Sequence, residues 1–389
     1  GRRGGKRGGG GGNGGGGRGG SSASDFMVGQ LGGVASTNGA GLNYVDQWGK
    51  MKFTGSYFFN QTKNDSEQQV EREFFDSSLP GMTYEEFTQA QMENFNHRFN
   101  IKMDYQFDKN NSLTIRPKLS LQDNHSWNTL DGTNLLNGVA SDQVTSNSTK
   151  DAFAYNAGLD LTYRHRFGKE GRTLSAMFGG TWSNNSSDTY RESWQGNDTT
   201  ILNQKNKGDM DRIGVFLRGG ATYHVTRKDD IGLSFMGMFG GGDSRTTLTS
   251  RDGLGALTRE RWSDEDGTHN DWGVTLDYTH LFGKNHDLRL YANYFQMNWN
   301  ETNDFTQNSL VKDVWLKSAQ KQDENNSHQR WEFQADYSNQ ISDRFKIEAG
   351  YKGNINSRGD DVYTLEGPDM ENLKPQEALN NDFTYKENI

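Results

Sequence analysis

Apolar and polar residues alternate along most of this chain, and that period of two limits the fold more than any other feature of the sequence. The alternation is plainest from Phe99 to Phe107, where every second residue is apolar and the residues between them are Asn, Lys, Asp and Gln. A polar turn at 108–111 follows, and a second alternating stretch begins at Leu113. Because neighbouring side chains of a strand point to opposite faces, this pattern predicts antiparallel β-hairpins that are apolar on one face only.

The hairpin recurs about every 60 residues. Its polar turns are centred near Trp48, Asn110, Lys169, Lys228, Asn285 and Asp343. They predict about twelve strands, at 36–45, 51–60, 97–107, 112–123, 152–166, 172–183, 212–225, 231–240, 271–282, 287–299, 331–341 and 345–355. The hairpins are separated by long polar segments, at 61–95, 126–150, 184–210, 242–270, 300–329 and 356–389. Short periplasmic turns that alternate with long extracellular loops are typical of an antiparallel up-and-down transmembrane β-barrel, whereas the two ends of a soluble sandwich show no such asymmetry.

The residues on the two faces of the predicted strands support this architecture. The apolar face of the stretch 213–223 carries no charged residue, as contact with lipid would require. The opposite face of the strands carries many charges and therefore needs water. We expect these charges to line a hydrated lumen, and six of them are candidate ligand-binding residues: Arg116, Lys118, Arg164, Arg218, Asp160 and Asp277.

Aromatic residues gather at both ends of the predicted strands, as Tyr and Trp do at membrane–water boundaries. Near the short turns lie Tyr44, Tyr105, Phe107, Tyr163, Phe167, Tyr223, Tyr278, Phe282 and Tyr337. Near the opposite ends lie Tyr57, Phe59, Trp127, Trp182, Phe239, Trp299 and Trp331. Pro117 interrupts the apolar face in mid-strand, where its missing N–H predicts a β-bulge or an error in the assumed register.

Composition excludes several other classes of protein. Hydrophobic residues make up only 31% of the 389 residues, too few for a conventional dry core, yet aromatic residues make up 12%, too many for a disordered chain. The longest apolar run, 152–155, is far short of the roughly 20 residues of a transmembrane helix. The absence of Cys excludes disulfides and thiolate metal sites, and the net charge of −9 gives no reason to expect a nucleic-acid partner.

The first 25 residues form a Gly/Arg-rich segment, which we expect to be a flexible loop. The Arg-Gly-Gly pattern of this segment would also suit an RNA-binding tail, but the rest of the chain is acidic and contains no nucleic-acid-binding motif. The remainder, 26–389, is predicted to be a partial β-barrel. An open sheet of about twelve strands would expose two edges, so we expect further strands and interpret the chain as a piece of a larger protein.

Two stretches carry a resemblance to a known family: FMVGQLGGVASTNGAGLNYVDQWGKMKFTGSYFFNQTKN (Phe26–Asn64) and NHRFNIKMDYQFDKNNSLTIRP (Asn96–Pro117). They resemble the barrel portion of TonB-dependent receptor-like outer-membrane proteins of Bacteroidetes. The resemblance implies a barrel of about 22 strands in the bacterial outer membrane. It also implies a plug domain, absent from this chain, and uptake powered by a TonB-type energy transducer. No functional residue can be carried over, since the plug and the transducer-contacting box are not in this sequence.

Candidate residues for chemistry are sparse. Asp264, Asp266 and Asn270 offer oxygen ligands at near-alternate spacing and are candidates for a calcium site in a loop, although the EF-hand pattern is incomplete. The eight His residues are scattered and show no local arrangement with a nucleophile. We therefore expect no enzyme activity, no catalytic residue and no cofactor.

The sequence thus predicts part of an outer-membrane receptor that captures a solute and transports it inward. Outer-membrane lipid, a TonB-type transducer and a surface lipoprotein are the candidate partners. A passive outer-membrane channel is one alternative, and a surface-exposed binding or adhesion protein that does not transport is another.

Overall fold

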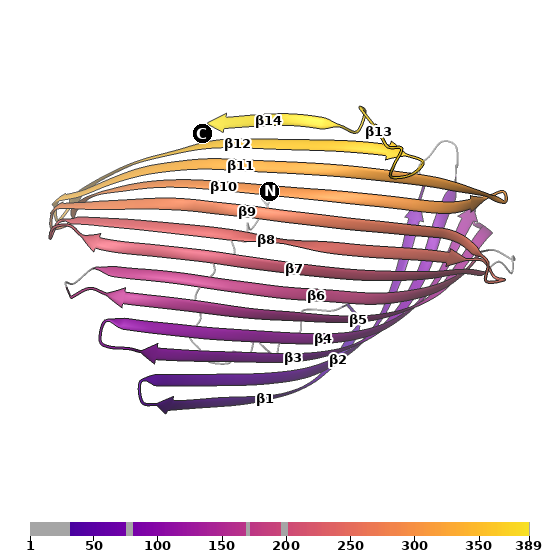
Figure 1. The fold of residues 1–389 in the computed structure, drawn as a ribbon, viewed down its shortest axis with the longest axis horizontal. Helices are drawn as coiled ribbons and strands as arrows, with labels where there is room; N and C mark the ends of the chain where they lie inside the picture. The colour runs from indigo at the N-terminus through magenta and orange to yellow at the C-terminus, as the bar shows by residue number, and fades with distance from the viewer. Residues whose placement is uncertain (1–31, 75–80, 169–171, 196–200, 389) are drawn as a thin grey trace, which may run out of the picture.

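The computed structural model describes residues 32–74, 81–168, 172–195 and 201–388, so the Gly/Arg-rich segment 1–25 lies outside the described residues. The described residues form one antiparallel sheet and contain no helix that could cross a membrane. The strands are β1 (Val34–Trp48), β2 (Met51–Glu73), β3 (Met82–Gln106), β4 (Asn111–Leu136), β5 (Val139–Arg166), β6 (Thr173–Gln195), β7 (Ile201–His224), β8 (Asp229–Arg251), β9 (Leu257–Gly283), β10 (His286–Val311), β11 (Val314–Ser342), β12 (Phe345–Gly367), β13 (Lys374–Pro375) and β14 (Asn381–Asn388). Each strand from β1 to β12 pairs with the next in chain order (Figure 1), which confirms the predicted all-β, up-and-down fold.

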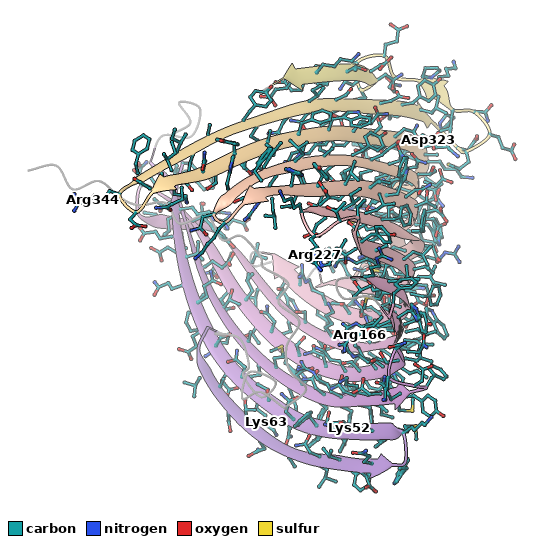
Figure 2. The ribbon with its side chains drawn as sticks, turned by 90° about the vertical axis from the view of Figure 1, so that its left-hand side faces the viewer. Lys52, Lys63, Arg166, Arg227, Asp323 and Arg344 are labelled. Atoms are coloured by element: carbon teal, nitrogen blue, oxygen red, sulfur yellow. The ribbon has the colours of Figure 1, made fainter. Side chains whose placement is uncertain are left out.

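The sheet curves into a trough that stays open along one side (Figure 2). One edge is β1, and at the other edge both β13 and β14 pair with β12, so the described strands do not close into a barrel. The sheet has 14 strands rather than the predicted twelve or so. The two additional strands, β13 and β14, are short and fall in the segment 356–389, which was expected to be a loop.

The long polar segments were wrongly predicted to be loops. They are the halves of the strands that lie far from the short turns, and β2 to β12 run for 23 to 29 residues. In the segment 61–95, for example, Lys63 pairs with Glu93 and Arg72 with Tyr84. In these strand extensions, the backbone N–H and C=O groups form hydrogen bonds with the neighbouring strand, whichever side chains are present. Both of their faces are polar, so the period of two that marks a half-apolar strand is lost from the sequence.

The strand register places the predicted apolar residues on one face of the sheet, which we call the outer face. A single transverse row on this face runs from β1 to β7 through Leu42, Tyr57, Phe99, Leu119, Ala157, Trp182 and Ile213. The opposite face, which we call the inner face, carries the charged residues of the same strands. The apolar band of the outer face covers the half of each strand next to the short turns.

Burial in this sheet is the reverse of burial in a soluble protein. Apolar side chains of the outer face are exposed, including Leu42 (74%), Ile213 (61%) and Tyr351 (70%). Polar residues of the inner face are buried, with Asp160 and Asp271 only 7% and 8% exposed. Such a large exposed apolar surface marks contact with lipid or with another protein.

Pro117 does not produce the predicted bulge or a register error. Pairing between β3 and β4 skips two residues on each strand, 101–102 and 116–117, and resumes in the same register at Met103 and Ile115. On its other side, Pro117 stays in register with Leu159 of β5. The missing N–H therefore interrupts the ladder toward β3 without displacing the strand.

Candidate functional site

All six predicted ligand-binding residues lie on the inner face. Arg116 and Lys118 belong to β4, Asp160 and Arg164 to β5, Arg218 to β7 and Asp277 to β9. Residues paired across antiparallel strands share a face, and the registers of β4 to β9 place these side chains opposite to the apolar band. The inner face is therefore the candidate functional surface, and its charges fall into separate groups.

The first group is an ion pair in the wall of the sheet. Lys118 Nζ lies 2.6 Å from Asp160 Oδ2, and Asp160 is nearly buried. Arg116 is the direct cross-strand partner of Asp160. A buried carboxylate needs such cations for compensation. Lys118 and Asp160 consequently hold each other in place and are less available to a ligand than Arg164, Arg218 and Asp277.

The second group surrounds a hollow of ≈ 420 Å³ near the short turns, which we call the lower hollow. Arg164, Arg218 and Asp277 line it, and small residues such as Ser175 and Gly220 form its floor. Within the described part of the chain, neither arginine forms an ion pair or a hydrogen bond. The fold thus brings together three candidates that are far apart in the sequence and leaves two guanidinium groups free for an anionic group of a ligand.

A second hollow of ≈ 530 Å³, the upper hollow, lies further along the inner face of β6 to β10. Its polar lining includes Arg212, Glu265, His269 and Glu301, and the indole of Trp299 adds an aromatic surface. No residue of this hollow was singled out from the sequence as a lumen residue. Glu265, His269 and Glu301 lie in segments that were predicted to be loops, so no alternation of faces was counted there from the sequence.

Trp299 was placed in the outer aromatic girdle, and that prediction is wrong. Trp299 is the direct cross-strand partner of His269 of β9, so both side chains point to the inner face, and both line the upper hollow. The outer face of β10 carries Tyr294 and then the polar residues Gln296 and Asn298. Because the apolar alternation stops at Tyr294, the sequence provided no clear indication of the face to which Trp299 points.

Glycine shapes the upper hollow. At Gly240 of β8, an added Cβ atom would lie 2.5 Å from the carbonyl oxygen of Ile213 and 2.6 Å from Cε1 of His269. The absence of a side chain lets the imidazole of His269 lie against the strand. Phe216 likewise packs its ring against Gly179 of β6, and it contributes to the apolar part of the same hollow.

The three calcium candidates do not form a gathered ligand set. Asp264, Asp266 and Asn270 lie in strand β9 rather than in the predicted loop. Asp264 Oδ1 is 2.6 Å from Nε of Arg245, so this carboxylate already has a cationic partner. Among the described residues, no three His, Cys, Asp or Glu side chains are grouped so that they could hold a metal ion. Calcium binding here stays a prediction that the geometry does not favour.

Comparison with known proteins agrees with the two-faced sheet. Residues 280–389 match the outer membrane protein β-barrel family. No curated protein matches the chain.

Several solved structures are similar at low identity. The CymD monoaromatic hydrocarbon channel is 8% identical, with 74% of this chain and 84% of that chain covered and a TM-score of 0.23. The translocator domain of the autotransporter NalP from Neisseria meningitidis is 11% identical, with 87% of each chain covered and a TM-score of 0.22. The ferric yersiniabactin uptake receptor FyuA from Yersinia pestis is 9% identical, with 92% of this chain and 72% of that chain covered and a TM-score of 0.29. These TM-scores are too low to carry an argument about function. The family match and the exposed apolar band place the protein in the bacterial outer membrane.

Proposed function

We propose that this chain forms part of the barrel wall of an outer-membrane receptor of the TonB-dependent kind found in Bacteroidetes, and that the protein takes up a solute. The observation that carries the proposal is the inner face, where charged side chains line two hollows while the opposite face is apolar. Closed by further strands to a barrel of about 22, such a wall would enclose a polar lumen.

The solute would contact the free charges of the inner face. Arg164, Arg218 and Asp277 at the lower hollow are the proposed contacts among the six sequence candidates. Arg212 and Trp299 of the upper hollow join them in this proposal. A solute that meets both hollows would need an anionic group and an apolar part.

The proposal includes three partners and excludes others. Outer-membrane lipid would surround the apolar band, a TonB-type transducer would supply energy, and a surface lipoprotein would cover the extracellular side. We propose no catalytic step, no cofactor and no nucleic-acid partner for the protein.

The proposal can be tested by measuring the conductance of the full-length protein in planar lipid bilayers, with potassium chloride as the electrolyte. A receptor with a plug is expected to stay closed, and it should bind the purified periplasmic domain of a TonB-type transducer. A steady open conductance without such binding would favour a passive channel. A protein that is folded and monomeric in buffer without detergent would instead be a surface binding or adhesion protein.

A further inference from the structure

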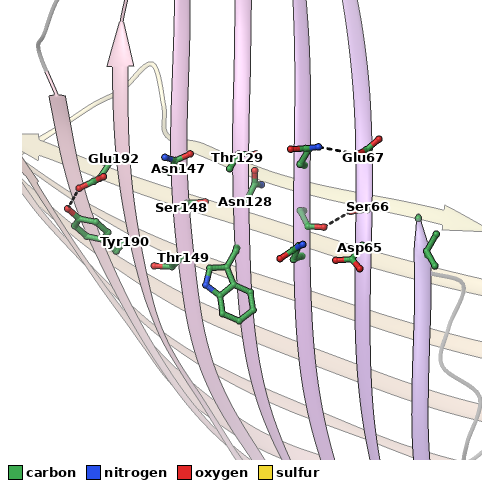
Figure 3. A pocket seen from close by; sticks show the side chains of 16 residues that line it. Asp65, Ser66, Glu67, Asn128, Thr129, Asn147, Ser148, Thr149, Tyr190 and Glu192 are labelled. Atoms are coloured by element: carbon green, nitrogen blue, oxygen red, sulfur yellow. Dashed lines mark hydrogen bonds between the residues drawn. The ribbon is translucent and has the colours of Figure 1, made fainter.

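The outer face is hollowed beyond the apolar band. This outer hollow of ≈ 770 Å³ lies over β2 to β6, at the tip of the shorter strand β1 (Figure 3). Its walls come from the polar strand extensions. It opens on the side of the sheet that carries the apolar band and not on the inner face.

Two transverse rows of side chains line the outer hollow. The first row consists of Asp65, Gln91, Trp127, Thr149 and Tyr190. The second row consists of Glu67, Gln89, Thr129, Asn147 and Glu192. Members of a row are direct cross-strand partners and therefore point to the same side.

Two aromatic rings stand in the first row with a small residue between them. Trp127 and Tyr190 are 46% and 43% exposed, and Thr149 separates them. They lie two strands apart, or about 10 Å. This gap admits one sugar ring, whose C–H faces pack against aromatic rings. The hydroxyl of Tyr190 donates to Glu192 Oε1 at 2.7 Å (Figure 3), which fixes the position of the phenol.

The polar groups around these rings suit hydroxyl groups of a ligand. Within the described part of the chain, the side chains of Asp65, Gln91 and Asn147 make no hydrogen bond, so donors and acceptors are both free. The charged side chains of the hollow are the carboxylates of Asp65, Glu67 and Glu192, with no Lys or Arg among its lining residues. Phosphate and acidic glycans would be repelled, whereas a neutral saccharide would not.

We propose that the outer hollow binds a neutral oligosaccharide at the bacterial surface. Trp127 lies six residues beyond Leu121 of the apolar band, which is about 20 Å along the strand and about 14 Å along the membrane normal for a strand tilted by about 45°. That height is beyond the hydrocarbon, so Trp127 lies above the aromatic girdle in which it was placed from the sequence, at the level where surface glycans begin. The saccharide can belong to a surface glycolipid or be a free glycan, since the recognising chemistry is the same.

Calorimetric titration of the full-length protein in detergent tests this site. The probes are maltohexaose, lipopolysaccharide that bears an uncharged saccharide chain, and lipid A alone, the last two dispersed in the same detergent as the protein. We expect saturable binding of a saccharide probe, weakened at least tenfold by Trp127→Ala and by Tyr190→Ala. Tyr190→Phe keeps the ring and should change the affinity at most about threefold. Trp262→Ala is the matched control, because Trp262 is an exposed outer-face residue of β9 outside the hollow.

The probes also distinguish the two sources. Binding of maltohexaose indicates a free glycan, and binding only of the saccharide-bearing lipopolysaccharide indicates the glycolipid. The proposal is overturned if neither saccharide probe binds, if lipid A alone binds equally well, or if Trp262→Ala weakens binding as much as Trp127→Ala. Mobility of unheated samples in gels verifies that each variant is folded. The result does not depend on whether the inner face transports a solute.

Discussion

Gly240 occupies a position where the neighbouring strands leave no room for a side chain. A Cβ atom there would meet a backbone carbonyl and the ring of His269, whereas at Gly232 of the same strand the nearest atom would be 3.4 Å away. We predict that Gly240→Ala lowers the free energy of unfolding by about 1–3 kcal/mol. Gly232→Ala should change it by less than about 0.5 kcal/mol. Urea unfolding in lipid vesicles measures both, and equal losses would contradict the packing of His269.

His125 lies on the outer face beyond the apolar band, between two carboxylates. Its Nδ1 is 2.6 Å from Asp151 Oδ1, and its Nε2 is 3.6 Å from Asp123 Oδ1. The hydrogen bond to Asp151, with the charges of both carboxylates, raises the pKa of His125 above its ordinary value. The stabilisation by this contact is fully present below the unfolded pKa and is lost as pH rises through the raised folded pKa.

We therefore predict that NMR titration of labelled His125 gives a pKa above the ordinary value, and that Asp151→Asn lowers it. Asp188→Asn serves as a control, because Asp188 lies in the same transverse row but has no contact with His125. An unchanged pKa in Asp151→Asn would show that the contact does not form.

Single residues also show which assignments could be made from the sequence and which could not. The charged candidates were assigned to the correct face because alternation near the short turns is unbroken, as with Arg218 between Leu217 and Gly219. Trp299 was misplaced because polar residues flank it on both faces. The gathering of Arg164 with Asp277 required the cross-strand register, which no local pattern encodes.

At the scale of a strand, the same substitution should cost much more stability on the outer face than on the inner face. Phe178 of β6 points to the outer face opposite Leu217, and its neighbour Met177 lines the lower hollow. Phe178→Arg is predicted to lower the free energy of unfolding by about 2–4 kcal/mol, since it places a cation in lipid. Met177→Arg should cost less than about 1 kcal/mol in a hydrated lumen.

Vesicle unfolding experiments measure this difference directly, with the same side chain introduced at adjacent positions of one strand. Equal costs for Phe178→Arg and Met177→Arg would mean that both faces of β6 meet the same environment. The assignment of lipid to the outer face would then be wrong.

The strand halves near the short turns could be predicted from sequence, and their extensions could not. Where one face meets lipid and the other water, selection of residue type leaves a period of two. The extensions of β2 and β3 are wet on both faces, so Glu67 and Gln89 pair there without any apolar alternation. Polar composition was consequently mistaken for loop structure.

At the scale of the whole molecule, the low hydrophobic content is accounted for by geometry. Only about half of each long strand contributes to the apolar band, and only every second residue of that half faces outward. The interior is polar, as the buried Asp160 and Asp271 show. A fraction of 31% hydrophobic residues is thus enough for a wall that needs no dry core.

The opposite character of the two faces is the central claim, and a scan of spin labels along β7 tests it most directly. Labels placed one at a time at positions 213–222 of the full-length protein in bilayers report contact with lipid-soluble oxygen or a water-soluble nickel chelate. We predict oxygen contact at Val215, Leu217 and Ala221 and nickel contact at Phe216 and Arg218, with a period of two. Nickel contact at every position, or the reverse alternation, would contradict the account.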